Sequence, residues 1–295
     1  MKKVLICTLN CFLFVNFYAQ QGEIVTVYAG KQISINTSSP TKQKEVGKAV
    51  MEFVYEYSYL TDTTDITSEI KDMMILQVGY GISKFTSYRV MQIDSLINVS
   101  TADQIKANPG KYIGGETFSI YKNYPVGKFT TTDKISTDWF MYEEDIPIQD
   151  WRIDVDGTKE ILGYKCKRAE CDFRGRKYIA WYCEDIAVAD GPWKFGGLMG
   201  FIMEINDIEE HYKFTLVGIN SNAVRDITIP DVQYNKTTRG KFYNTKHKYD
   251  INPVGYMSSV SGVNVIITSP DGTHNNAVDQ PRELQYDYIE RDYRR

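Results

Sequence analysis

In Asp190-Gly-Pro-Trp-Lys-Phe-Gly-Gly-Leu-Met-Gly-Phe-Ile-Met-Glu-Ile-Asn-Asp207 the chain gathers four of its 21 glycines, with Pro192, Trp193 and Phe195 between them. Glycine clusters of this kind mark backbone that bends sharply or that another group approaches closely. After Gly200, apolar residues alternate as they do in a half-buried strand. The stretch therefore predicts a tight, packed turn that leads into a strand.

Short alternating runs separated by turn signals, typical of antiparallel strands, occupy most of the chain. Phe53, Tyr55, Tyr57 and Tyr59 share one face of the first run, and such a stripe either packs in a core or lines a ligand cavity. Glycines at Gly79, Gly81 and 196–200 favour a sheet that curls. The sequence predicts a mainly β fold: an antiparallel, curved sheet or half-barrel with a few short helices and a mixed C-terminal extension. Expected strands cover residues 52–60, 73–78, 83–88, 116–122, 128–132, 160–172, 176–184, 201–205, 211–219 and 263–268.

Turns, helices and domain limits follow from the residues between these strands. Asp156-Gly157 is the strongest hairpin signal in the chain, and Arg174-Gly175 is expected to turn the strand 160–172 back on itself. Helices are expected at 89–96 and 234–249, and residues 20–50 are expected to be mostly loop. We expect three parts: a signal peptide at 1–19, a β domain at 20–225 and a C-terminal extension at 226–295.

The first 19 residues have the pattern of a secretory signal peptide. Lys2 and Lys3 precede a mostly apolar run at 4–17, and Ala19 is a small residue suited to cleavage. The apolar run is too short for a membrane anchor. We therefore expect an exported protein that is periplasmic, associated with the outer membrane, or secreted.

Three of the five cysteines, Cys166, Cys171 and Cys183, follow the expected signal peptide, and an oxidising compartment would let two of them pair. If Arg174-Gly175 is a two-residue loop, Cys166 stands directly opposite Cys183 in a non-hydrogen-bonded pair, with Cα atoms about 4.5 Å apart. Cys171 falls on the other face. The register predicts a Cys166–Cys183 disulfide; three reduced, packed cysteines are the alternative.

A family resemblance is carried by three stretches: Ile161-Leu-Gly-Tyr-Lys-Cys166, Arg174-Gly-Arg-Lys-Tyr-Ile-Ala-Trp-Tyr182 and Gly191-Pro-Trp-Lys-Phe-Gly-Gly-Leu-Met-Gly-Phe-Ile202. They resemble the GLPGLI family, exported proteins of Gram-negative envelopes that are named after a glycine motif. Met199 stands where that motif has proline, and Phe201 where it has leucine, so the backbone is less constrained at this turn. The resemblance covers about residues 50–220. It implies an envelope location and supplies no activity.

The sequence shows no recognisable catalytic or metal-binding motif. The histidines, His211, His247 and His274, have no metal-ligand spacing and lie far from the cysteines in sequence. Glu143-Glu144-Asp145 is interpreted as a solvated acidic loop, because sequence neighbours rarely supply the facing carboxyls of a glycosidase. The carboxylates at 207–210 lack the spaced oxygens of a calcium loop. We expect no metal and no cofactor.

Candidate binding residues lie in the glycine motif and beside it. A glycine turn can cradle an anion, but this one lacks the ending of a phosphate loop, so close packing against an aromatic ring is favoured. The residues singled out are Gly191, Pro192, Trp193, Phe195, Gly197, Leu198, Gly200 and Trp181.

The composition limits the classes of molecule that we expect this protein to bind. The net charge of −4 gives no reason to expect a nucleic acid. The leading hypothesis is a non-enzymatic envelope protein that binds an apolar ligand or a partner protein. Two alternatives stay open: a surface-assembly component that docks through the basic segment 234–249, which also suits peripheral contact with anionic lipid, and a hydrolase whose site is assembled from distant residues.

Overall fold

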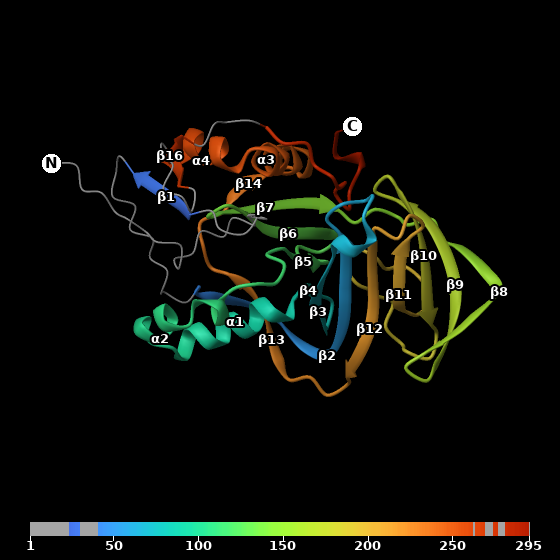
Figure 1. The fold of residues 1–295 in the computed structure, drawn as a ribbon. Helices are drawn as coiled ribbons and strands as arrows, with labels where there is room; N and C mark the ends of the chain where they lie inside the picture. Colours follow the sequence, from blue (N-terminus) through green and yellow to red (C-terminus); the bar gives the residue numbers. More distant parts are fainter. Residues whose placement is uncertain (1–23, 30–40, 262, 269–273, 277–280, 295) are drawn as a thin grey trace.

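A computed structural model describes residues 24–29, 41–261, 263–268, 274–276 and 281–294, so the expected signal peptide lies outside the described residues. It contains one sheet of 13 strands and one of three (Figure 1). The large sheet has the order β14-β7-β6-β5-β4-β3-β2-β12-β11-β10-β9-β8, with β13 also paired to β2. The strands are β1 (Ile24–Ala29), β2 (Gln43–Leu60), β3 (Glu69–Gly79), β4 (Ser83–Ser87), β5 (Ser119–Lys122), β6 (Lys128–Ile135), β7 (Asp138–Asp145), β8 (Arg152–Ile161), β9 (Tyr164–Phe173), β10 (Arg176–Cys183), β11 (Phe201–Asp207), β12 (Tyr212–Asn220), β13 (Arg225–Pro230), β14 (Asn235–Thr237), β15 (Val263–Thr268) and β16 (His274–Asn276).

The predicted fold class is confirmed: the protein is mainly β, and its large sheet is antiparallel except for the parallel pair β14–β7. The sheet stays open, with β8 at one edge and β14 at the other, and it curves strongly (Figure 1). Strand β2 organises it. Its first half pairs with β13 and its second half with β12, while β3 runs along its other side. The predicted strand 52–60 is therefore only the second half of β2, and part of the expected loop 20–50 is strand.

The aromatic stripe of β2 forms the core. Phe53, Tyr55 and Tyr57 are buried, and the rings of Phe53 and Phe201 stack with centroids 3.8 Å apart. The ring of Tyr57 stacks on Phe214 at 4.6 Å. Burial of each such side chain stabilises the fold by about 1.5–3 kcal/mol. Because these rings contact one another, the stripe packs in a core instead of lining a cavity.

The prediction of a hairpin at Asp156-Gly157 is wrong. Strand β8 continues through this pair, with a bulge between Asp154 and Thr158, and the chain turns at Leu162-Gly163 instead. Asp154 causes the difference, because its Oδ1 accepts hydrogen bonds from the backbone N–H groups of both Asp156 and Gly157. A Cβ at Gly157 would lie 2.7 Å from the Cβ of Arg168, so the glycine serves close approach between strands. A bulge also protects an edge strand from pairing with another chain.

The helices are short, as expected. They are α1 (Tyr88–Val99), α2 (Ala102–Ala107), α3 (Arg239–Ile251) and α4 (Pro253–Ser261), with short 3-10 turns at Ile66–Ser68, Pro109–Tyr112 and Asp292–Arg294. α1 confirms the expected helix at 89–96. α3 starts five residues later than the expected 234, because β14 occupies 235–237 and Thr238 caps the helix through its side chain. None of the helices in the described ranges combines the length and apolar character needed to cross a bilayer.

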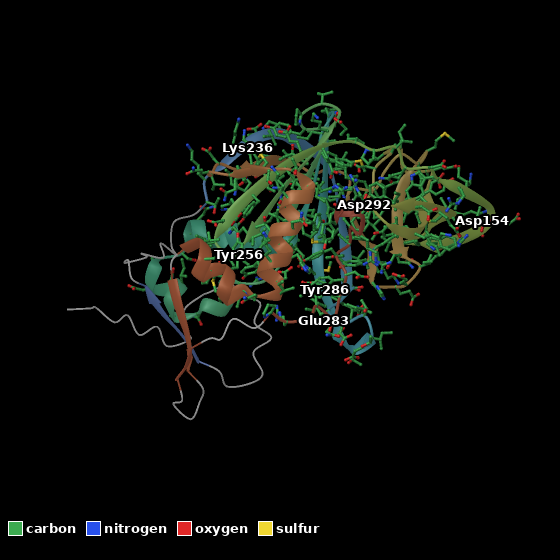
Figure 2. The ribbon with its side chains drawn as sticks, turned by 90° about the horizontal axis from the view of Figure 1, so that it is seen from above. Asp154, Lys236, Tyr256, Glu283, Tyr286 and Asp292 are labelled. Atoms are coloured by element: carbon green, nitrogen blue, oxygen red, sulfur yellow. The ribbon has the colours of Figure 1, made fainter. Side chains whose placement is uncertain are left out.

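The C-terminal extension packs against the β domain. β13 begins at residue 225, at the expected boundary, and pairs with β2; α3 packs against β7 and β6 (Figure 1). The C-terminal strap, defined here as residues 281–294, runs back over the sheet, and Figure 2 shows Tyr286 and Asp292 beside α3, far from Asp154 at the β8 edge. The expected strand at 263–268 is confirmed as β15, which pairs with β1 and β16.

Candidate functional site

The glycine motif, residues 190–200, lies in the connection from β10 to β11, and its buried side chains pack into the core of the sheet. We call this segment the plug. Trp193, Phe195 and Leu198 are buried, and the Trp193 and Phe195 ring centroids lie 5.2 Å apart. A Cβ at Gly200, whose φ is +154°, would lie 2.3 Å from the backbone oxygen of Cys183. Close approach therefore accounts for Gly200 and for Gly191, where an added Cβ would lie 2.9 Å from the side chain of Ile202, whereas Gly196 and Gly197 have no atom nearer than 3.8 Å to an added Cβ.

One buried lysine joins the start of the plug to its middle. The ammonium of Lys122 donates to Asp190 Oδ1 at 2.6 Å, to the carbonyl of Gly191 at 2.7 Å and to the carbonyl of Phe195 at 2.6 Å. Burial lowers the pKa of Lys122, while Asp190 raises it in part. Ser83 donates to the other oxygen of Asp190 at 2.6 Å. Strands β4 and β5 thus fix the motif through charge-assisted hydrogen bonds.

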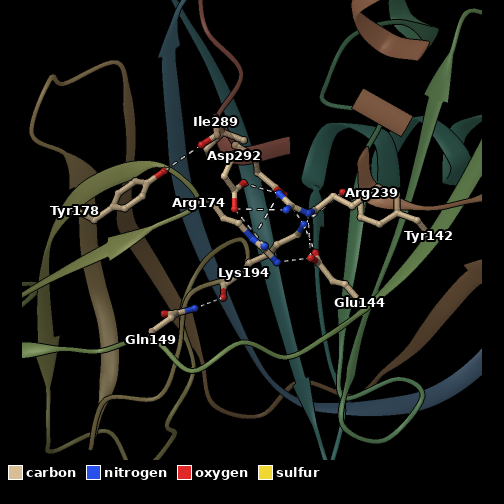
Figure 3. A network of polar contacts seen from close by, with 10 residues as sticks. Tyr142, Glu144, Gln149, Arg174, Tyr178, Lys194, Arg239, Ile289 and Asp292 are labelled. Carbon is tan, nitrogen blue, oxygen red and sulfur yellow. Dashed lines mark hydrogen bonds and ion pairs between the residues drawn. The ribbon is translucent and has the colours of Figure 1, made fainter. Parts of the chain in front are cut away.

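A second lysine, Lys194, extends from the plug into a buried ionic network (Figure 3). Its side chain is 1% exposed, and its ammonium is bonded to the carboxylates of Glu144 and Glu290. Burial alone would lower the pKa of Lys194, but Glu290, Tyr142 and Glu144 hold it above its usual value. The charge is therefore retained, and it links the motif to β7 and to the C-terminal strap.

Two arginines complete this network. Arg174 pairs with Glu144, and Arg239 of α3 donates to Glu290 Oε2 at 2.7 Å and to Asp292 Oδ1 at 2.6 Å. Burial would raise the pKa of Glu290, but Lys194 and the arginines lower it overall. An ionised, fully paired carboxylate does not carry a proton for general acid catalysis at neutral pH. The network therefore suits a structural joint.

The connection between β7 and β8 clamps the outer side of the plug. Gln149 donates through Nε2 to the carbonyl of Lys194 at 2.7 Å and accepts from the N–H of Gly196 at 3.2 Å. Trp151 donates through Nε1 to the carbonyl of Gly196 at 2.9 Å. Segment 146–151 is thus fixed to the motif.

Four loops at this end of the sheet each present a large exposed apolar side chain. We call this set the loop rim: Tyr80, Val126, Ile148 and Met199, which are 91%, 84%, 96% and 80% exposed. Hydrogen bonds join the four loops to one another in the order of the sequence.

The bonds that join the rim are short and mostly backbone-directed. Asn123 Nδ2 donates to the carbonyl of Gly81 at 2.7 Å, and the N–H of Ile146 donates to the carbonyl of Gly127 at 3.2 Å. Gln149 then joins the third loop to the motif. The exposed side chains therefore stand on a framework whose loops hold one another in place.

The sequence-predicted residues divide into three groups. Gly191, Pro192 and the buried plug residues lie in the core, whereas Gly197 is exposed beside Met199. Trp181 is half-buried in β10, with the ammonium of Lys159 at 5.6 Å from its ring, and it is not part of the rim.

The cysteine register is confirmed, since β9 and β10 pair through Phe173↔Arg176 to Lys167↔Tyr182. The observed pairs end one step before Cys166 and Cys183, and the structure does not contain the predicted disulfide: Cys166, Cys171 and Cys183 are buried free cysteines.

Several polar residues of the site, Lys122, Gln149, Arg239 and Glu290 among them, were not identified from sequence. Glu290 lies about a hundred residues from the motif and carries no local signal. Lys194 did carry one, because a lysine stands alone among buried aromatic and glycine residues of the motif. A charged residue in such a run needs a buried partner.

Two charged features found in the sequence serve ion pairs inside the protein. Asp207, Glu209 and His211 each present a ligand atom within 4.8 Å of the others, but the buried guanidinium of Arg176 lies 2.7 Å from Asp207 and 3.3 Å from Glu209. In the basic segment, Lys246 pairs with Asp250 at 2.9 Å, as Arg239 does with the strap. Both features contribute to internal electrostatics.

Comparisons with known proteins give one family similarity. Residues 89–230 match the family described as N-glycanase peptide, N-terminal domain. A search of curated proteins gave no match. Among solved structures, PNGF-II in space group P21 covers 68% of this chain at 11% identity with a TM-score of 0.44, and PNGF-II in space group C2 covers 67% at 12% identity with the same score. The chain spans about a third of the length of these PNGF-II chains (33% and 32%).

Proposed function

We propose that this protein is a non-enzymatic, exported envelope protein of the GLPGLI type that binds a partner protein through the loop rim. The observation that carries the proposal is the exposure of Tyr80, Val126, Ile148 and Met199 on four loops that hydrogen bonds hold together. Contiguous exposed apolar surface marks protein–protein interaction sites, and hydrogen bonds between the four loops bring them together at one end of the sheet. A preorganised rim also loses little conformational entropy on binding.

The packed interior favours a protein partner over an apolar small molecule. The motif side chains Trp193, Phe195 and Leu198 belong to the same buried hydrophobic cluster as the aromatic stripe of β2. A ligand entering there would have to displace the plug and its bonds to Lys122. The outer rim is already exposed and needs no such rearrangement.

The decisive experiment compares two sets of substitutions in the full chain. The rim set is Tyr80→Ser, Val126→Ser, Ile148→Ser and Met199→Ser. The control set is Ile66→Ser and Leu162→Ser, which are also exposed but lie on other turns. Chemical crosslinking in intact cells, followed by quantitative mass spectrometry, should show a crosslinked protein that the rim set loses by at least tenfold and the control set keeps. Identical crosslinks in both sets would contradict the proposal.

Export is tested separately. N-terminal sequencing of the protein from fractionated cells should give a chain that begins after Ala19, in the envelope fraction. An intact Met1 in the cytoplasmic fraction would refute export without bearing on the rim.

A second candidate function rests on the family similarity at 89–230. An N-glycanase-related chain would release N-linked glycans or hold glycosylated substrates. Incubation with a denatured N-glycoprotein, followed by gel mobility, tests the first activity, and the proposal above predicts no mobility shift. Binding of the same glycoprotein that depends on its glycans would favour a glycan-directed partner.

A further inference from the structure

The best-defined unexplained feature is the pair of cysteines at the open end of the β9–β10 hairpin. Observed pairs run from Phe173↔Arg176 beside the turn to Lys167↔Tyr182. One step further along the same register sets Cys166 against Cys183. Hydrogen-bonded and non-hydrogen-bonded pairs alternate in such a ladder, and the pair that closes a two-residue turn is hydrogen-bonded.

Counting outward from Phe173↔Arg176, the cysteine pair is of the non-hydrogen-bonded kind. Cα atoms of such pairs lie about 4.5 Å apart, within the range that a disulfide spans. Both side chains also leave the sheet on the same face. Cys171 does not compete. It pairs with Tyr178 and lies five positions along the strand from Cys166, and an odd offset places it on the opposite face.

We propose that Cys166 and Cys183 form a disulfide in the folded, exported protein. The bond would join β9 to β10 beside the glycine motif, because a Cβ added at Gly200 would lie 2.3 Å from the backbone oxygen of Cys183. It would thereby fix the backbone on which the plug rests. This inference does not depend on the rim or on its partner.

The reaction is a thiol–disulfide exchange with a small-molecule disulfide. The thiolate of one cysteine attacks the oxidant, one oxidant thiolate leaves, and a mixed disulfide forms. The second protein thiolate then attacks the protein sulfur and releases the other oxidant thiol. Two protein thiols are oxidised to one disulfide, one oxidant disulfide is reduced to two thiols, and the two protons pass to the released thiols.

Burial sets the order of events. Cys166 and Cys183 are fully buried once the sheet has formed. Burial, with the neighbouring Cys183, raises the pKa of Cys166 to about 11, so its thiolate is scarce at neutral pH. We therefore expect oxidation to accompany folding, before the two cysteines are buried, and a protein folded under reducing conditions should resist later oxidation.

Trypsin makes the test direct, because it places the three cysteines in separate peptides: 166–167, 169–174 and 178–194. The chain without the expected signal peptide, residues 20–295, is refolded with reduced and oxidised glutathione, alkylated in denaturant without reductant, and digested. We expect peptide 166–167 linked to 178–194, with Cys171 alkylated. A Cys171→Ser variant should keep this link, and Cys183→Ser should lose it.

Three alkylated cysteines in wild-type protein that has refolded, or a link that includes Cys171, would overturn the proposal. The wild-type map decides even if Cys183→Ser fails to fold. As a second readout, the oxidised protein should have a thermal midpoint several degrees above that of protein refolded with reductant. Equal midpoints together with a confirmed link would refute the stapling role while leaving the bond itself established.

Discussion

At the scale of single residues, Gly200 is a position with no room for a side chain. Its added Cβ would lie 2.3 Å from the carbonyl oxygen and 2.8 Å from the carbonyl carbon of Cys183, both backbone atoms that cannot rotate away. We expect Gly200→Ala to lower the free energy of unfolding by about 2–4 kcal/mol, because β10 and the motif must separate. Urea denaturation followed by tryptophan fluorescence measures this.

Gly197→Ala is the matched control. Gly197 has a φ of +84°, and the nearest atom to an added Cβ is Trp151 Nε1 at 3.9 Å. Only the left-handed backbone is penalised, by about 1–2 kcal/mol. Equal losses for the two variants would show that the close approach at Gly200 does not matter.

Lys194 allows a second prediction at this scale. Lys194→Met keeps the length of the side chain but leaves Glu144 and Glu290 with fewer cations in a buried site. Breaking a buried pair on one side typically costs about 3–5 kcal/mol. Lys167→Met removes a half-exposed pair with Glu184 and should change stability far less. Similar denaturation midpoints for the two variants would argue against the network as a joint.

The residues also show what sequence reasoning can reach. The motif glycines and aromatic residues were identified because their own chemistry limits their surroundings. The partners Lys122, Asp190 and Glu290 were not, because each is an ordinary surface residue type whose burial depends on contacts made across the sheet.

At the scale of elements, the segment entering β5 carries a pH-dependent contact. Tyr59 donates to Glu116 Oε1 at 2.9 Å, and the N–H of Glu116 donates to Asp72 Oδ2 at 2.8 Å. Burial raises the pKa of Glu116 to about 7; the Tyr59 hydrogen bond and Lys246 oppose this, and Asp133 and Asp72 add to it. The native state therefore binds a proton between about pH 4.5 and pH 7 that the unfolded state has released.

The direction in which stability changes with pH follows from that bound proton. The stability of the wild type should fall as pH rises through this window and level off above about pH 7. In Glu116→Gln the fall should shrink by about 1–3 kcal/mol, allowing for solvent screening. Unfolding free energies at pH 5 and pH 8 test this, with Glu143→Gln as the exposed control. A Glu116→Gln slope equal to that of the wild type would contradict the assignment.

Elements were predictable where local rules and the sheet agree. The register of β9 and β10 followed from a two-residue turn, because Arg174 and Gly175 both adopt positive φ. Asp156-Gly157 has the same local signal and yet lies within a strand, since Asp154 satisfies its N–H groups and Arg168 packs against the glycine. At Asp156-Gly157 the contacts within and between strands outweigh the local preference for a turn, and these contacts cannot be read from the sequence.

At the scale of the whole molecule, the C-terminal strap joins parts of the chain that are distant in sequence. Its backbone carbonyls accept hydrogen bonds from three side chains of the sheet. The carbonyl of Asp287 accepts from the Tyr212 hydroxyl, that of Tyr288 accepts from Arg176 Nη2 at 3.1 Å, and that of Ile289 accepts from the Tyr178 hydroxyl at 3.5 Å. Its Glu290 is fully buried within the ionic network. The boundary expected from composition therefore does not separate two independent units at this point.

Deletion of residues 281–295 should consequently destabilise the β domain itself. Arg176, whose side chain is fully buried, and Lys194 would each lose an anion or acceptor and become hydrated. We expect the thermal midpoint to fall by more than it does in Lys194→Met, and limited proteolysis to cut within the motif.

Glu290→Gln in the full chain distinguishes the effect of the buried charge from the effect of the strap's packing on the sheet, because it removes the anion and keeps the strap. A midpoint for Glu290→Gln equal to that of the deletion would assign the effect to the buried charge. A deletion that leaves the midpoint unchanged would show instead that the β domain folds without its C-terminal extension, and the basic segment would again be available for docking.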